Sequence, residues 1–270
     1  MELLVLVLLA GGAGALIGGT QTFVITGFVG ILSYVMQACG VNTAFFDQYV
    51  LNTFFLPCVI FNGACVATAY SAFHYDIRGF HTNKSLAFTN DIKVILMGCL
   101  GGLLGWTIYS IANKLALPLD TGALSVLSVA ILLRLFLNKE QKYNPTRLAY
   151  MKKIPMKEIS FQLFMGFVFS LAMAYFAYET KLYTIGFSIS ALSLLFGFTD
   201  SFFPATHHTT LVAGYAVMQT GNIFMGVLFG MISHMISYVF GEIFNTECGT
   251  HFDPPAVAIA LCSLVLFMFF

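Results

Sequence analysis

Long apolar stretches, separated by short polar or glycine-rich breaks, constrain this chain more than any other feature of its sequence. A helix needs roughly 17–25 mostly apolar residues to cross a lipid bilayer. Only 9% of the 270 residues are charged, whereas a soluble domain carries roughly 25%. The pattern therefore predicts an all-α polytopic membrane protein. We expect about ten transmembrane helices, at 3–19, 22–38, 54–72, 93–112, 119–137, 159–178, 183–199, 204–220, 222–244 and 254–270.

The same composition argues against several other classes of protein. The net charge is zero and no basic stripe occurs, so we expect no nucleic-acid partner. The six cysteines are scattered without a C-x-x-C pair, which argues against a disulfide or zinc framework. No nucleotide, dinucleotide or hydrolase motif is present. We therefore expect no cofactor, no metal and no enzyme activity. Because Met1-Glu2-Leu3 lacks a basic residue, the first stretch is interpreted as a membrane helix and not a signal peptide.

The positions of the twelve Lys and Arg residues predict an orientation. With the N-terminus outside, ten of them lie on the cytoplasmic side, in the loop after the third stretch and in the central linker. Basic loops stay on the cytoplasmic side of a membrane. We therefore expect both termini outside the plasma (inner) membrane.

The basic linker also divides the chain into two halves that resemble each other. Gly98 to Asn113 aligns with Gly230 to Asn245, and Asp120 then aligns with Asp253 at the start of the last stretch of each half. This order predicts a 5+5 inverted repeat, an arrangement typical of transporters. We divide the chain into a first five-helix repeat, a basic cytoplasmic linker and a second five-helix repeat: residues 1–137, 138–158 and 159–270.

Polar residues inside apolar spans are costly unless they are paired or face water, so each is a functional candidate. His234 lies at the middle of its span and would suit a proton relay or solute coordination. The alternative is a structural histidine that bonds the next helix. Its repeat counterpart is Gly102, which leaves room for a solute or for a close helix approach.

A second polar segment follows Pro204, which we place in the first turn of a helix. Thr206, His207, His208 and Thr209 would then lie near free backbone N–H groups, beside a solute path. An interfacial polar cap is the alternative. In the first half Asn62 holds the corresponding position, and we expect it opposite these residues.

The aspartates that open the last span of each half, Asp120 and Asp253, are interpreted first as helix N-caps. The second interpretation is a gate or relay in which Asp120 and Asp253 act with His251 and Glu242.

The sequence thus predicts a membrane transporter or facilitator for a small solute or ion, with the lipid bilayer as its surroundings. A channel and a non-catalytic subunit of a larger complex remain alternatives, and an intramembrane enzyme is a third. Glycine-rich helix faces also make a homo-oligomer an expectation.

Overall fold

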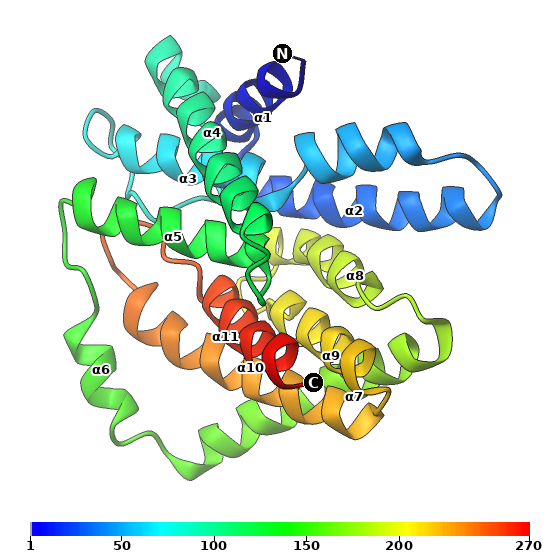
Figure 1. Ribbon diagram of the computed structural model, residues 1–270. Coiled ribbons are helices and arrows are strands. Elements are labelled where there is room, and N and C mark those ends of the chain that lie inside the picture. Colours follow the sequence, from blue (N-terminus) through cyan, green and yellow to red (C-terminus); the bar gives the residue numbers. More distant parts are fainter. Residues whose placement is uncertain (1) are drawn as a thin grey trace.

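The regular secondary structure is helical in the computed structural model, which describes residues 2–270 (Figure 1). The part preceding the linker comprises α1 (Glu2–Ile17), α2 (Gly19–Ala38), η1 (Phe46–Phe54), α3 (Pro57–Ser71), η2 (Ala87–Thr89), α4 (Ile92–Lys114) and α5 (Thr121–Phe136). The rest comprises α6 (Pro145–Met151), α7 (Met156–Thr180), α8 (Ile185–Ser193), η3 (Leu194–Phe198), α9 (His207–Thr220), α10 (Ile223–Phe244) and α11 (Pro254–Phe269). No β-strand occurs within residues 2–270, so the all-helical prediction is confirmed.

Five helical segments are long and apolar enough to cross a membrane, judged by length and composition. Four more apolar helices are shorter: α1, α5, α11 and the continuous segment of α8 and η3. All ten predicted stretches overlap helices. The five long segments are α2, η1 with α3, α4, α7 and α10.

Several boundaries differ from those expected. Only Gly18 separates α1 from α2, with φ at +101°, a backbone conformation that glycine adopts at little cost. The linker is not a simple loop, because Asn144 caps a short helix, α6, by accepting the N–H of Arg147 at 3.1 Å. Pro204 was wrongly placed inside a helix: α9 begins three residues later, at His207.

Small residues allow the central helices to pack closely. Nearly every residue of α3 and of the first three turns of α9 is buried. A Cβ added at Gly14 in α1 would lie 2.0 Å from the carbonyl oxygen of Ile60 in α3. Gly102 likewise packs against Gly11 of α1, so the space at this position is used for a close helix approach.

The helices of the two halves pack in matching patterns. In the first half α1, α3 and α4 contact one another, and in the second α7, α9 and α10 do so. Helix α2 packs against α8, and α5 packs against α11. These two contacts join the halves, which lie above and below each other in Figure 1.

One buried cation secures the loops at the end of α5. Arg134 is 6% exposed and has no carboxylate partner among the described residues. Its Nε donates to Thr250 Oγ1 at 2.9 Å and its Nη2 to the carbonyl of Phe244 at 2.8 Å. Its Nη1 donates to the carbonyl of Lys142. The side chain therefore ties α5 to the linker and to the loop between α10 and α11.

Candidate functional site: a central cavity between the two halves

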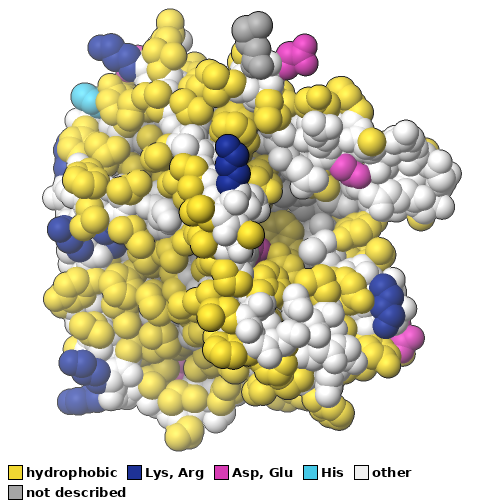
Figure 2. Space-filling view, viewed as in Figure 1, with side chains coloured by type: hydrophobic (Ala, Val, Ile, Leu, Met, Phe, Trp, Pro, Cys, Tyr) yellow, Lys and Arg dark blue, Asp and Glu magenta, His cyan; other side chains and the backbone are white. Residues whose placement is uncertain are grey.

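A cavity of about 760 Å³ lies between the two halves of the chain. Figure 2 shows it as a hollow on the right of the view, while hydrophobic side chains cover most of the face. It is lined by parts of α2, η1, α3, α4, α5, α8, α9 and α11. Polar side chains surround it towards the ends of α2 and α4 and the start of α8: Ser33, Gln37, Asn113 and Thr184. Helices from both halves thus build a single chamber.

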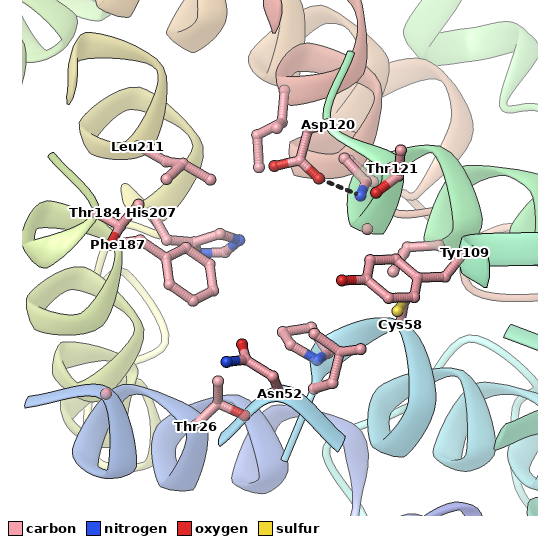
Figure 3. A pocket seen from close by; sticks show the side chains of 18 of the residues that line it. Thr26, Asn52, Cys58, Tyr109, Asp120, Thr121, Thr184, Phe187, His207 and Leu211 are labelled. Atoms are coloured by element: carbon pink, nitrogen blue, oxygen red, sulfur yellow. Dashed lines mark hydrogen bonds between the residues drawn. The ribbon is translucent and has the colours of Figure 1, made fainter. Parts of the chain in front are cut away.

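Side chains from several directions project into the cavity (Figure 3). His207 enters from α9, Tyr109 from α4 and Asp120 from the start of α5. Thr26 of α2 and Asn52 of η1 lie on the opposite wall from Asp120. Polar groups from both halves therefore meet at a shared space, although some of them also bond neighbouring segments, as Thr26 does with the carbonyl of Phe55 at 2.9 Å.

Two interrupted helical segments meet at this cavity. After η1 the helix is broken at residues 55–56 and resumes at Pro57, because proline fixes φ and lacks the N–H that a continuous helix needs. After η3 the chain is non-helical until α9 begins at His207. Pro57, Cys58 and His207 all line the cavity. The starts of α3 and α9, with unpaired backbone N–H groups and partial positive charge, therefore adjoin it.

Asp120 is both a helix cap and a cavity residue. Its Oδ1 accepts the N–H of Ala123 at 2.8 Å, as the capping interpretation predicts. Its Oδ2 accepts the hydroxyl of Tyr215 at 2.7 Å, and its own N–H donates to Ser263 Oγ at 2.8 Å. Both latter partners come from the second half.

Asp253 differs from its counterpart. It precedes α11, but its side chain makes no capping hydrogen bond, so this part of the capping prediction is wrong. Pro254 and Pro255 occupy the next positions and provide no N–H. The carboxylate lines the cavity, and its Oδ1 lies 3.8 Å from Nε2 of His251.

His234 does not line the cavity. Its Nε2 lies 3.0 Å from Gln162 Oε1 on α7, and its Nδ1 lies 3.2 Å from Thr209 Oγ1 on α9. The ring also stacks on His208 at a centroid distance of 5.8 Å. Because α7 and α9 cover this face of α10, His234, His208 and Thr209 form a buried cluster beside the cavity.

The other predicted residues are dispersed. Thr206 is buried at the start of α9 and does not line the cavity. Asn62 is buried too and does not line the cavity. Its Nδ2 donates to the carbonyl of Cys58, a lining residue, at 2.9 Å. Glu242 faces α6, where it pairs with Arg147 at 3.3 Å. The expected grouping of Glu242 with Asp253 and His251 therefore does not form.

Carboxylates outnumber all other charged groups in the cavity lining. Asp47, Asp120 and Asp253 line it, and no Lys or Arg does so within residues 2–270. No group of three or more His, Cys, Asp or Glu side chains in this described part could hold a metal ion. The arrangement suits reversible binding of a solute by charge and hydrogen bonds.

Sequence reasoning missed several lining residues, including Asp47, Asn52, Tyr109 and Tyr215. Tyrosine is common at membrane interfaces, so the sequence around Tyr109 and Tyr215 does not mark them as cavity residues. Asp47 and Asn52 belong to η1, which was not predicted as a helix. The break at Pro57 is the sequence signal that could have found Asp47 and Asn52, because the helical segment before such a break lines the same site as the helix after it.

A family model described as "Family of unknown function (DUF7973)" matches residues 1–144 and also residues 138–269. The two matches meet in the basic linker. No curated protein and no solved structure matches the chain.

Proposed function

The chain belongs to the family of unknown function DUF7973, and we propose that it is a membrane transporter that carries a small solute or ion through the central cavity. One observation carries the proposal: a polar chamber of about 760 Å³ lies between the two halves, at two interrupted helices. Interrupted helices at matching positions of two repeats are the usual site of substrate binding in secondary transporters.

The outer surface supports insertion in a bilayer. Large apolar side chains are exposed on the long helices, for example Leu96 on α4, Phe161 and Phe164 on α7, and Phe224 on α10. In water such a surface would associate, whereas lipid chains solvate it. We propose that the nine apolar helical segments and α9 all lie in the membrane, with the shorter ones packed among the longer ones.

The matching helix contacts support an inverted repeat. Each half has a central helix, α3 or α9, that packs on two neighbours of its own half. The family model matches both halves in turn, which supports a common origin for them. An odd number of spans in each half gives the halves opposite orientations in the membrane.

The distribution of charge supports a cavity that opens to the outside. Most Lys and Arg side chains in Figure 2 lie on the left, where Figure 1 places α6, and the hollow lies on the right. On the basic side, Thr250, Phe252 and Arg134 are all buried around the start of α11. We propose that this is an outward-facing state with its cytoplasmic side closed, which favours a transporter over an open channel.

Flux through reconstituted protein tests this proposal. Proteoliposomes are exposed in turn to hyperosmotic urea, glycerol, sodium formate and choline chloride, and re-swelling is followed by light scattering. We expect at least one of these solutes to enter faster than in protein-free liposomes. Re-swelling rates equal to those of empty liposomes for all four solutes would contradict the proposal.

A variant with a bulkier side chain in the cavity tests whether the flux passes through it. Asn52 points into the cavity and makes no side-chain hydrogen bond among the described residues, so Asn52→Trp adds bulk there at little cost to folding. We expect it to reduce flux several-fold. Asn83→Trp is the control, because Asn83 is exposed in the loop between α3 and α4. Equal flux in the two variants would place the path elsewhere.

A further inference from the structure

We propose that the central cavity binds a small organic cation whose positive charge is balanced by Asp120 and Asp253. This inference rests on the proposed function, because it names the class of solute that the transporter carries. The charged side chains that line the cavity are negative. Three carboxylates line it without a Lys or Arg among the described residues. Anions would be repelled by these carboxylates, and a cation would be attracted.

The carboxylate of Asp253 has no hydrogen-bond partner among the described residues. Asp253 is 8% exposed and accepts no hydrogen bond from the described residues. The nearest basic atom, Nε2 of His251, lies 3.8 Å away, outside hydrogen-bond distance. This contact is an ion pair only when the imidazole of His251 is protonated. A buried carboxylate is costly unless it is paired, and a bound cation would provide a counter-charge that does not depend on that protonation.

A second buried group is also without a partner. His207 is 6% exposed and lines the same cavity, and its Nδ1 makes no hydrogen bond within residues 2–270. A neutral imidazole offers one lone pair and one N–H. Nδ1 is itself inaccessible, so a solute in the cavity would bond the other ring nitrogen, Nε2, which makes no hydrogen bond to the described residues either. Asp253 and His207 thus both carry polar atoms that make no hydrogen bond to the described residues.

Aromatic side chains also line the cavity. Tyr215 and Phe267, with ring centroids 5.3 Å apart, line the cavity, and Tyr215 bonds Asp120. Phe23 and Phe187 lie 5.1 and 6.1 Å from the His207 ring, centroid to centroid. Aromatic faces attract ammonium groups, and quaternary ammonium ligands are commonly held this way.

The size of the cavity favours an organic solute over a bare metal ion. A volume of about 760 Å³ lies within the range of roughly 300–1,000 Å³ that is usual for small-molecule sites. The three carboxylates come from η1, α5 and the loop before α11, and no dense ligand set forms among the described residues. The partial charges at the starts of α3 and α9 act mainly within the first helical turn, so the full charges of the carboxylates dominate.

Choline and its neutral isostere, 3,3-dimethylbutan-1-ol, test the sign of the site because they differ mainly in charge. Binding of each to the full-length protein in detergent is measured by titration calorimetry. We expect choline to bind about tenfold or more tightly than the neutral isostere, because only choline can form a short-range charge pair with the carboxylates. Equal binding of the two compounds, or no choline binding in the millimolar range, would overturn the cation site.

Charge-neutralising variants test the residues. Asp253→Asn breaks no hydrogen bond, and Asp120→Asn retains an acceptor for the N–H of Ala123. We expect each to weaken choline binding about tenfold or more. Asp76→Asn removes the same charge from an exposed loop position and leaves binding unchanged. If Asp120→Asn fails to fold, Asp253→Asn decides alone, and unchanged choline binding in that variant contradicts the assignment.

The failure of this inference differs from the failure of the proposed function. Choline binding without flux of any tested solute would retain the cation site and reject transport. Flux of another solute without choline binding would retain transport and reject the cation site.

Discussion

The hydroxyl of Tyr215 in α9 donates to Oδ2 of Asp120 at 2.7 Å, so a side chain of the second half completes the helix cap of the first. Tyr215→Phe removes this bond and leaves the packing in place. Because a net hydrogen bond contributes about 1 kcal/mol, we expect the Tm to fall by about 2–4 °C. Thermal unfolding in detergent measures this shift. Tyr143→Phe is the control, since Tyr143 is 45% exposed, and an equal shift in both variants would contradict the role of the bond.

A close helix contact makes Gly105 intolerant of a side chain. A Cβ at Gly105 in α4 would lie 1.9 Å from the carbonyl oxygen of Cys58 in α3. Gly105→Ala must therefore push the two helices apart, at a cost of about 1–3 kcal/mol in the free energy of unfolding. Gly241→Ala is the matched control in α10, because its Cβ would meet only Pro254, at 3.6 Å. Denaturant titration should show a loss only for Gly105→Ala; similar values for both variants would contradict this contact.

The guanidinium group of Arg134 cannot be replaced by the ammonium group of a lysine. Its guanidinium donates to groups in three different segments, and an ammonium cannot reach all of them with the same geometry. We expect Arg134→Lys to lower the free energy of unfolding by about 2 kcal/mol and to expose the linker to trypsin. Arg78→Lys, at an exposed position, should change neither measurement. Unchanged proteolysis of Arg134→Lys would show that the linker is held by other contacts.

The loop between α3 and α4 contains a group that makes stability depend on pH. Burial lowers the pKa of His81 from its ordinary value of 6.5, and Lys84 and Arg78 lower it further. The unfolded chain therefore binds more protons at this residue than the folded chain does, and stability decreases as pH falls through about 6.5. The decrease ends below the lowered pKa of the folded state.

His81→Gln separates this contribution from that of the other histidines. We expect the difference in unfolding free energy between pH 8 and pH 5 (about 1.5 units either side of the ordinary pKa) to be smaller in the variant. Chemical denaturation at both pH values provides the measurement. An identical pH dependence in wild type and variant would contradict the assignment.

The sequence predicted the helices better than the site. Long apolar runs broken by Gly18 or Asp200 mark helix ends because backbone conformation and hydropathy are local properties. The direction in which one polar side chain faces depends on the neighbouring helix. His234 was placed on the path because it interrupts an apolar span, but Gln162 of α7 satisfies it instead. His207 and Asp120 do line the cavity, whereas nothing local to Tyr109 distinguishes a cavity residue from an interfacial one.

The contacts of α2 with α8 and of α5 with α11 have a geometric consequence. If the two halves are related by a two-fold axis, an element that touches its own counterpart must lie beside that axis. All four of these helices line the cavity. The axis would then pass through the chamber. In the transporter that we propose, a solute bound at its centre would keep its place while the halves exchanged conformations and the opening moved to the other side of the membrane.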